Sequence, residues 1–281
     1  MSADALATGG RSTRAGRGRR TGKRAFPGQR LLGLAGIFGF LATWELIPRL
    51  GLIDAKYLPP ASEVVMALVR DLGLTAFWVS VGETMKAWFL GLVLAIVLAV
   101  VLGFVIGSST FLRRATNSTV EFLRPIPSVA LIPLAVLLFG VKLESSLMLI
   151  TYAAFWQVLI QVLYGVADVD MVANNTAKTY GLGPLARIRY VVFPTALPYL
   201  MTGVRLAATV ALVLAITAEL VIGSPGLGRE IALAQSGGAI SGMYALVLAT
   251  GLIGVVINAL MRLIEKKTLS WHSSVRSEVI V

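Results

Sequence analysis

Six apolar segments follow one another along the chain, separated by shorter polar stretches. They are residues 31–47, 87–107, 129–139, 147–166, 200–222 and 245–264. The second, fourth, fifth and sixth have roughly the 20 residues that a helix needs to cross a bilayer. The first is marginal at 17 residues, and the third has only about 11 strongly apolar residues. The pattern predicts an all-α integral membrane protein with about six transmembrane helices.

The third segment is interrupted by helix-breaking residues. Pro125, Pro127 and Gly140 bound it, and Pro133 lies inside it. In isolation such a segment could be re-entrant. Extended back through residues 120–124 it could still cross, because neighbouring helices can satisfy the backbone groups that prolines leave free.

The polar stretch between the fourth and fifth segments, ANNTAKTYGLGPLARIRYVVFP, covers residues 173–194 and is called the elbow below. Residues 173–180 look like the end of a helix, and Gly181 stands where a left-handed C-terminal residue is usual. Pro184 suits the first turn of a second helix, which we expect to end at Pro194. A short helix–glycine–helix unit between two spans predicts a rigid knob on which another protein can dock.

Composition agrees with the membrane class and excludes several kinds of chemistry. Hydrophobic residues make up 57% of the 281, charged residues 14%, and the mean hydropathy is +0.82. An average soluble domain has about 25% charged residues. The absence of cysteine excludes disulfides, thiolate metal sites and cysteine nucleophiles. His272 is the single histidine, so a multi-histidine metal or catalytic site is also excluded.

Residues 1–30 differ from the rest of the chain. They hold eight Arg or Lys against one acid, Asp4, with no apolar periodicity. This composition predicts a disordered segment that holds the N-terminus in the cytoplasm and touches anionic lipid; a nucleic-acid-binding arm is the alternative. The expected division is therefore a basic segment 1–30, a membrane domain 31–270 with its core at about 80–266, and a cytoplasmic tail 271–281.

The distribution of basic residues predicts the orientation. With the N-terminus inside, the segments on the cytoplasmic side carry 18 Lys or Arg and those on the opposite side carry six. This split obeys the positive-inside rule and places both termini and the elbow in the cytoplasm.

A few polar residues inside the apolar segments are candidates for the solute path. Glu219 is one, because an acid within a membrane span is a functional candidate by default, although a hydrogen-bonded structural carboxylate is the favoured interpretation. Trp156 and Gln157 are further candidates, although helix–helix packing is the favoured interpretation of both. Glu45 has the same ambiguity as Glu219. Arg205 lies 14 residues before Glu219, about 21 Å along a helix, and is expected to reach lipid phosphates instead.

Small residues recur at four-residue spacing on the second segment: Gly91, Ala95, Ala99, Gly103 and Gly107. Such a stripe lets another helix approach closely, and we expect the partner to be a helix of the same chain.

The elbow resembles the cytoplasmic "EAA" loop of the permeases of ABC importers, whose pattern is E-A-A, three residues, Gly, nine residues and I-x-L-P. On this chain the pattern falls on Asn175, Thr176, Ala177 and Gly181, and then on Val191, Phe193 and Pro194. Ala177, Gly181 and Pro194 match, whereas Asn175 replaces the acid and Phe193 replaces Leu. The resemblance implies that Asn175, Thr176, Ala177, Gly181, Leu182 and Pro194 couple the chain to an ATPase.

Three further stretches, in the family's order, are similar to permeases that import sulfonates, taurine and nitrate. They are YLPPASEVVMALV at 57–69, NSTVEFLRPIPSVALIPLAVLLFG at 117–140 and AELVIGSPGLGREI at 218–231. Together with the elbow, the resemblance covers residues from about 31 to 272. It implies a type I ABC importer permease fold in the bacterial inner membrane, working as a homodimer. An extracytoplasmic binding protein would deliver a small anionic solute.

The chain lacks a nucleotide-binding motif of its own. No G-x-x-x-x-G-K-[ST] occurs, and the only Gly-Lys pair, Gly22-Lys23, is followed by Arg24. ATP, the only cofactor expected, would therefore be bound by a separate cytoplasmic subunit, and the chain itself would be neither an enzyme nor a metal protein. Alternatives are a permease for another solute such as a vitamin precursor, a proton-coupled secondary transporter using Glu219 or Glu45, and a structural or channel-like membrane protein.

Overall fold

A computed structural model describes residues 28–270, and all regular elements in this range are helices. The predicted tail 271–281, His272 and nearly all of the predicted segment 1–30 lie outside the described residues. The chain divides into two compact units, residues 1–39 and 40–281. Helix α1, Gly28–Arg49, begins in the first unit and ends in the second.

The second unit holds the remaining helices. Their bounds are α2 Ala61–Leu72, α3 Thr75–Ser108, α4 Thr110–Leu123, the 3₁₀ helix η1 Ser128–Leu131, α5 Ile132–Phe139, α6 Leu143–Ala167, α7 Met171–Thr179, α8 Pro184–Arg187, the π-helix η2 Ile188–Val192, α9 Phe193–Ile222, α10 Leu227–Ser236 and α11 Ile240–Thr268.

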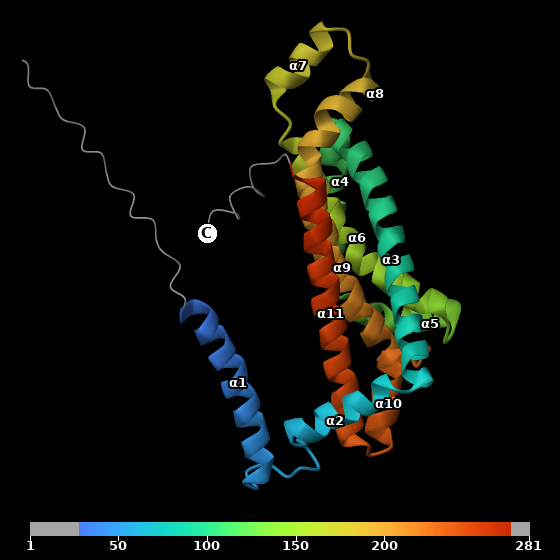
Figure 1. Ribbon diagram of the computed structural model, residues 1–281. Helices are drawn as coiled ribbons and strands as arrows, with labels where there is room; N and C mark the ends of the chain where they lie inside the picture. The colour runs from blue at the N-terminus through green and yellow to red at the C-terminus, as the bar shows by residue number, and fades with distance from the viewer. Residues whose placement is uncertain (1–27, 271–281) are drawn as a thin grey trace, which may run out of the picture. The chain divides into compact units, whose positions relative to one another are not determined.

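Four helices of the described residues are long and apolar enough to cross a membrane. They are α3, α6, α11 and the continuous stretch Pro184–Ile222, which correspond to the second, fourth, sixth and fifth predicted segments. Within the second unit these helices run side by side, with α7 and α8 at one end and α2 and α10 at the other (Figure 1). The third predicted segment allows a fifth span, so the expected number of six stays a prediction.

The third segment forms a bent pair rather than one straight helix. Helix α4 and the η1–α5 stretch meet at an angle of 82° across the break that contains Pro125 and Pro127. Pro133 lies in the first turn of α5, where its missing N–H costs no hydrogen bond. Gly140 ends α5 with φ +72°. Both the broken span and the re-entrant loop fit this geometry.

Helix α6 packs on α3 through the predicted stripe of small residues. A Cβ atom at Gly91 would lie 2.5 Å from Ile150 Cγ2, and one at Gly103 would lie 2.6 Å from Val162 Cγ1. Ala95 and Ala99 between them are fully buried. The β-branched ridge of α6 therefore sits in a groove that only the missing side chains of α3 leave open. The partner of the stripe is a helix of the same chain, as expected.

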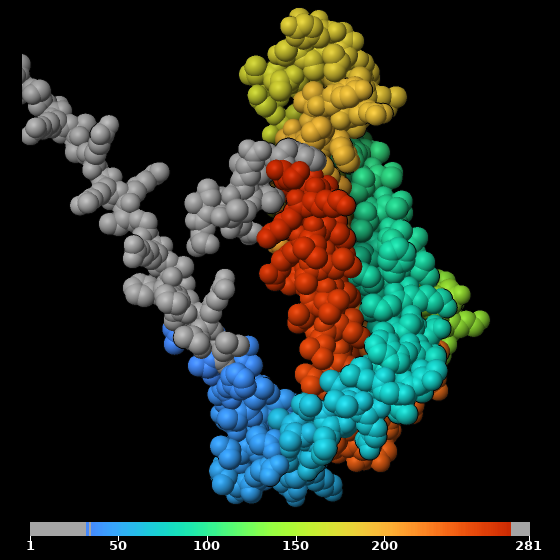
Figure 2. Space-filling view, viewed as in Figure 1, coloured from blue at the N-terminus to red at the C-terminus, as the bar shows by residue number. Residues whose placement is uncertain are grey.

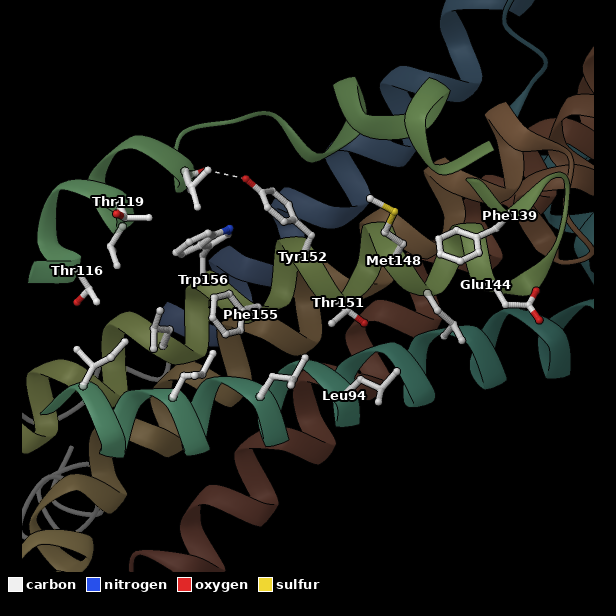
Figure 3. A pocket seen from close by; sticks show the side chains of 17 residues that line it. Leu94, Thr116, Thr119, Phe139, Glu144, Met148, Thr151, Tyr152, Phe155 and Trp156 are labelled. Atoms are coloured by element: carbon white, nitrogen blue, oxygen red, sulfur yellow. Dashed lines mark hydrogen bonds between the residues drawn. The ribbon is translucent and has the colours of Figure 1, made fainter. Parts of the chain in front are cut away.

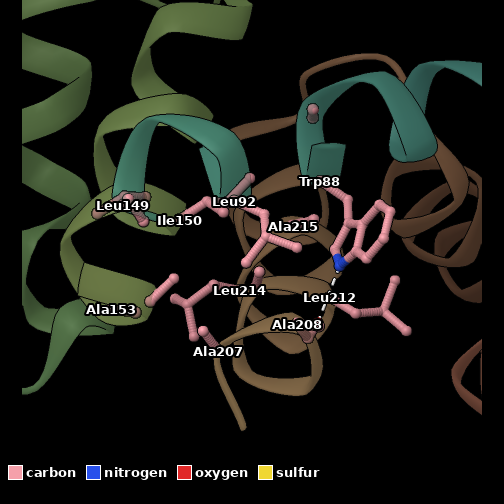
Figure 4. Packing of buried hydrophobic residues seen from close by; sticks show 14 of the residues in the cluster. Trp88, Leu92, Leu149, Ile150, Ala153, Ala207, Ala208, Leu212, Leu214 and Ala215 are labelled. Atoms are coloured by element: carbon pink, nitrogen blue, oxygen red, sulfur yellow. Dashed lines mark hydrogen bonds between the residues drawn. The ribbon is translucent and has the colours of Figure 1, made fainter. Parts of the chain in front are cut away.

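The other side of α6 packs on α9, whose inner face is also built from small residues. Ala207, Ala208, Ala211, Ala215 and Ala218 are fully buried there. Trp88 of α3 closes the core by donating its indole N–H to the carbonyl oxygen of Ala208 at 2.8 Å (Figure 4). Close backbone approach of three helices makes this part of the molecule a firm support for the elements at its two ends.

Candidate functional site

The elbow begins with a helix that is closed at both ends by hydrogen bonds. The Asp170 side chain accepts from the backbone N–H of Val172 at 2.8 Å, capping α7. At the other end Gly181 has φ +77°, the left-handed conformation expected from the sequence. Its N–H donates to Lys178 O at 2.9 Å, and Leu182 N–H donates to Ala177 O at 3.0 Å. These two bonds form the Schellman motif, which turns the chain sharply toward α8.

The elbow protrudes beyond the ends of the long helices (Figure 2). Asn175 and Thr176 are exposed on it, so both are available to a partner. Ala177 is only 8% exposed and Leu182 is partly buried, so these two predicted coupling residues pack largely within the chain itself. The most exposed apolar side chains of the elbow are those of Tyr180, 81% exposed, and Leu185, 82% exposed. The motif could not identify them, because they fall between its defining positions.

The prediction that Pro194 ends the second elbow helix is wrong. Helix α8 runs through the π-helix η2 into α9, giving one continuous helical stretch, Pro184–Ile222. A π-helix bonds each N–H five residues back and usually occurs as a single turn. Pro194 therefore stands in the first turn of the α-helical segment that follows, where proline is tolerated. Thr195 donates its hydroxyl to Val191 O at 2.8 Å within this turn.

The two sides of the elbow are consequently attached differently. Helix α8 is continuous with the span α9. Between α6 and α7 the helix is interrupted at residues 168–170. Here Tyr199 of α9 donates its hydroxyl to Asp168 Oδ2 at 2.9 Å. The elbow is therefore continuous in helical structure with α9 and not with α6.

A second polar cluster lies at the opposite end of the second unit, around Glu219. This residue is 1% exposed. Its Oε2 accepts from Thr84 Oγ1 at 2.9 Å and from the backbone N–H of Gly228 at 3.0 Å. The Thr84 hydroxyl oxygen in turn accepts from the backbone N–H of Leu227 at 2.9 Å. This is the hydrogen-bonded carboxylate favoured from the sequence.

Gly226, which precedes α10, and Gly228, in its first turn, are required by the close approach of this region to α9. Gly226 has φ +151°, a conformation that L side chains rarely adopt, and a Cβ there would overlap the Glu219 carboxyl group. A Cβ at Gly228 would overlap Ile216 O and Glu219 Cβ. The turn can therefore close on α9 only because these positions have no side chain. Glu219 Oε1 has no hydrogen-bond partner among the described residues, and Glu219 is one of the residues that line a cavity of about 230 Å³.

The remaining path candidates are not brought together with Glu219. Trp156 is 8% exposed and lies edge-on to Phe155, with ring centroids 5.0 Å apart. It lines a separate, apolar cavity between α3, α4 and α6 (Figure 3). Gln157 is partly buried, and its carbonyl oxygen lies against Gly203 of α9. The three residues therefore do not form one site within this chain.

Two further polar residues of the apolar segments, Arg205 and Glu45, have partners within the chain. Arg205 pairs with Glu265 of α11, Nη1 to Oε2 at 2.9 Å, rather than reaching for lipid phosphate as expected. Nothing in the sequence marks Glu265 as its partner, because the two residues are 60 positions apart. Glu45 accepts from both the N–H and the hydroxyl of Ser62, at 2.9 and 2.8 Å, and so caps the start of α2.

Comparisons with known proteins place the chain in a family. Residues 65–270 match the family described as binding-protein-dependent transport system inner membrane component. The taurine transport system permease protein TauC of Escherichia coli (strain K12) is 27% identical over 84% of this chain and 88% of that protein. The nitrate import permease protein NrtB of Leptolyngbya laminosa is 27% identical over 71% of this chain and 70% of that protein.

Solved structures share the fold. The crystal structure of an amino acid ABC transporter with histidines matches with a TM-score of 0.57 and 19% identity, over 68% of this chain and 94% of that chain. The family match covers most of the chain, and the fold agrees with it. The chain therefore belongs to the inner-membrane components of binding-protein-dependent transport systems, the permease subunits of ABC importers.

Proposed function

We propose that this chain forms the translocation path for a small anionic solute of the taurine, aliphatic sulfonate or nitrate type. The family implies two kinds of partner, a cytoplasmic ATPase and an extracytoplasmic binding protein. The class of solute is supported by the names of the relatives, because TauC is named for taurine and NrtB for nitrate. A vitamin precursor is the alternative cargo, since related permeases share the scaffold.

The observation that carries the coupling mechanism is the continuity of the elbow with α9. Tyr180 and Leu185 offer exposed apolar contacts, and Asn175 and Thr176 lie exposed beside them on α7. When ATP draws two ATPase subunits together, the bound elbows move with them. The movement passes along the stretch Pro184–Ile222, whereas the interruption at residues 168–170 leaves α6 without a direct helical link to the elbow. Inward-open and outward-open states would alternate in this way.

A second copy of the chain completes the proposed path. Within one copy α3, α6 and α9 pack directly on one another through glycine and alanine. A solute is therefore proposed to pass between two copies related by a two-fold axis. The excess of Lys and Arg on one side, 18 against six, supports an orientation with both termini and the elbow in the cytoplasm.

Glu219 is assigned a positioning role in this scheme. Two donors hold Oε2, and the turn at Gly226 closes over the carboxyl group. A proton carrier must exchange protons with both sides of the membrane, which this enclosed position opposes. The geometry therefore favours ATP-driven import over proton-coupled transport.

The test is uptake into proteoliposomes that contain the permease, its ATPase and its binding protein. We expect uptake of taurine, an alkanesulfonate or nitrate to require ATP on the elbow side and to persist when the proton gradient is collapsed. Uptake that follows the proton gradient without ATP would contradict the proposal. Comparing the loaded binding proteins for stimulation of ATP hydrolysis identifies the solute, and a response to a vitamin precursor alone would replace the anion class.

A further inference from the structure

Two cavities adjoin between α4 and the α3–α6 pair. One has a volume of about 690 Å³ and the other about 590 Å³. Ile106, Thr116 and Val120 line both, so the two spaces are neighbours along the same walls. Figure 3 shows the larger cavity, with a row of α3 side chains on one side, aromatic rings of α6 on another and Thr116 and Thr119 of α4 at one end.

The smaller cavity is lined by more positive than negative charge. Arg113 and Arg124 line it, together with Asn117 and Tyr164. Neither arginine has an ion pair within residues 28–270, and Arg113 Nε is shut off from solvent without a hydrogen-bond partner. Glu121 also lines the cavity and keeps its negative charge, although its Oε1 accepts from the neutral amide of Asn117 at 2.9 Å. Two guanidinium groups against one carboxylate leave the lining with an excess of one positive charge for an anion.

The larger cavity is suited to a long apolar chain. Leu94, Leu98, Leu102 and Ile106 follow at four-residue spacing along α3 and line its length. Twelve residues of helix correspond to about 18 Å, somewhat more than one leaflet of a hydrocarbon core about 30 Å thick. Trp156 and Phe155 form part of the opposite wall. The groove is therefore apolar and runs along a spanning helix, which is also the direction of an acyl chain in a bilayer.

We propose that the joined cavities bind one anionic phospholipid, with its phosphate at the arginines of the smaller cavity and one acyl chain along the leucines of α3. Basic pockets between transmembrane helices on the cytoplasmic side are known to suit such headgroups. The inner leaflet is specified because the proposed orientation places Arg113 and Arg124 on the cytoplasmic side. A solute of taurine size is too short to fill the groove, and this distinguishes the proposed lipid from such a cargo.

The test measures lipid retained by the purified full-length permease, without its ATPase. Native mass spectrometry after exchange into phosphatidylglycerol or phosphatidylcholine gives the occupancy of each lipid. We expect preferential binding of phosphatidylglycerol, weakened about fivefold by Arg113→Gln or Arg124→Gln alone and further by both together. Arg114→Gln is the matched control, because Arg114 is exposed on the same helix and lines neither cavity.

A second pair of variants tests the groove. Leu98→Trp fills the larger cavity and should lower retention of phosphatidylglycerol. Val101→Trp, on an exposed position of α3 outside both cavities, should leave it unchanged.

Equal retention by the wild type and the double arginine variant would overturn the proposal, as would equal losses in Arg114→Gln. Displacement of the lipid by methanesulfonate, which has no acyl chain, would assign the site to cargo instead. Loss of binding only when the dimer dissociates would assign the groove to a second copy. Because the readout is lipid and not transport, its failure leaves the importer assignment untouched.

Discussion

Glu219 of α9 and Thr84 of α3 share a buried 2.9 Å hydrogen bond across 135 positions of sequence. The same threonine hydroxyl accepts from Leu227 N–H at the start of α10. One side chain therefore joins three helices at the end of the second unit opposite the elbow. Any movement of α9 that starts at the elbow must either carry this junction with it or break it.

Thr84→Val is expected to destabilise the permease. The change leaves the N–H of Leu227 without a partner and removes one of the two donors to Glu219 Oε2. An unsatisfied buried polar group costs about 1–3 kcal/mol. Thermal unfolding in detergent should show a Tm lowered by several degrees. Thr209→Val is the control, because exposed Thr209 donates only to Arg205 O of its own helix. Equal Tm values for the two variants would contradict the proposed junction.

Gly181→Val should uncouple transport without preventing membrane insertion. At φ +77° a side chain costs about 1–2 kcal/mol, and the strain falls on the turn that places α8. Gly183→Val is a matched control: neither glycine has an atom within 4 Å of its virtual Cβ, but Gly183 has φ −63°. ATP-driven uptake should therefore fall for the first variant only. Normal uptake by Gly181→Val would remove the elbow from the coupling mechanism.

Single cysteines test the orientation on the natural cysteine-free background. Asn175→Cys should react with an impermeant thiol reagent only from the cytoplasm, and Lys142→Cys only from outside, since both positions are exposed. Ser224 is unsuitable because it is 3% exposed, although its place in the sequence suggests an outer turn. Fully buried Ala154→Cys should react only after denaturation. Labelling of Asn175→Cys from outside would reverse the topology.

The Arg205–Glu265 ion pair should couple α9 to α11. A double-mutant cycle with Arg205→Gln and Glu265→Gln is expected to give about 0.5–1 kcal/mol, because both side chains are partly exposed. Salt should weaken this coupling. Pairing Arg205→Gln with Lys267→Gln, at an exposed position nearby in the sequence, should give none. A coupling free energy of zero in both cycles would contradict the ion pair and favour contact of Arg205 with lipid phosphates instead.

Local patterns predicted much of this molecule. The four long helices follow from apolar length alone, and the left-handed Gly181 follows from its place between two helical runs. Each of these features depends on residues within a few turns of one another. The small residues of α3 likewise predicted a closely packed helix, but the sequence did not indicate that this helix is α6.

Contacts between distant segments were not predictable from one sequence. No local sequence pattern indicates that Thr84 contacts Glu219 or that Glu265 contacts Arg205, because the partners lie far apart in the sequence. The prediction that Pro194 ends a helix failed for a different reason. Its local signal for a helix end is real, but the π-helix before it places the proline in a new first turn. The distinction between exposed Leu185 and partly buried Leu182 also required coordinates.

Docking of the ATPase is predicted to depend on apolar contact at the elbow rather than on charge. Leu185 is 82% exposed on α8, and burying a leucine in a partner contributes about 1.5–3 kcal/mol. Leu185→Asp should therefore weaken association with the ATPase at least about tenfold. Leu182→Asp should also weaken it, but partly by loosening the elbow, since Leu182 is half-buried there.

Asn175→Glu provides the contrasting variant. It restores the acid of the family pattern at an exposed position, and one exposed charge is worth only about 0–1 kcal/mol. We expect assembly and uptake to be preserved. Co-purification with the ATPase in detergent measures association, and circular dichroism checks that the helices of each variant are intact. Dissociation by Asn175→Glu with normal binding by Leu185→Asp would show that the interface is polar, and the apolar contact proposed for Tyr180 and Leu185 would then have to be abandoned.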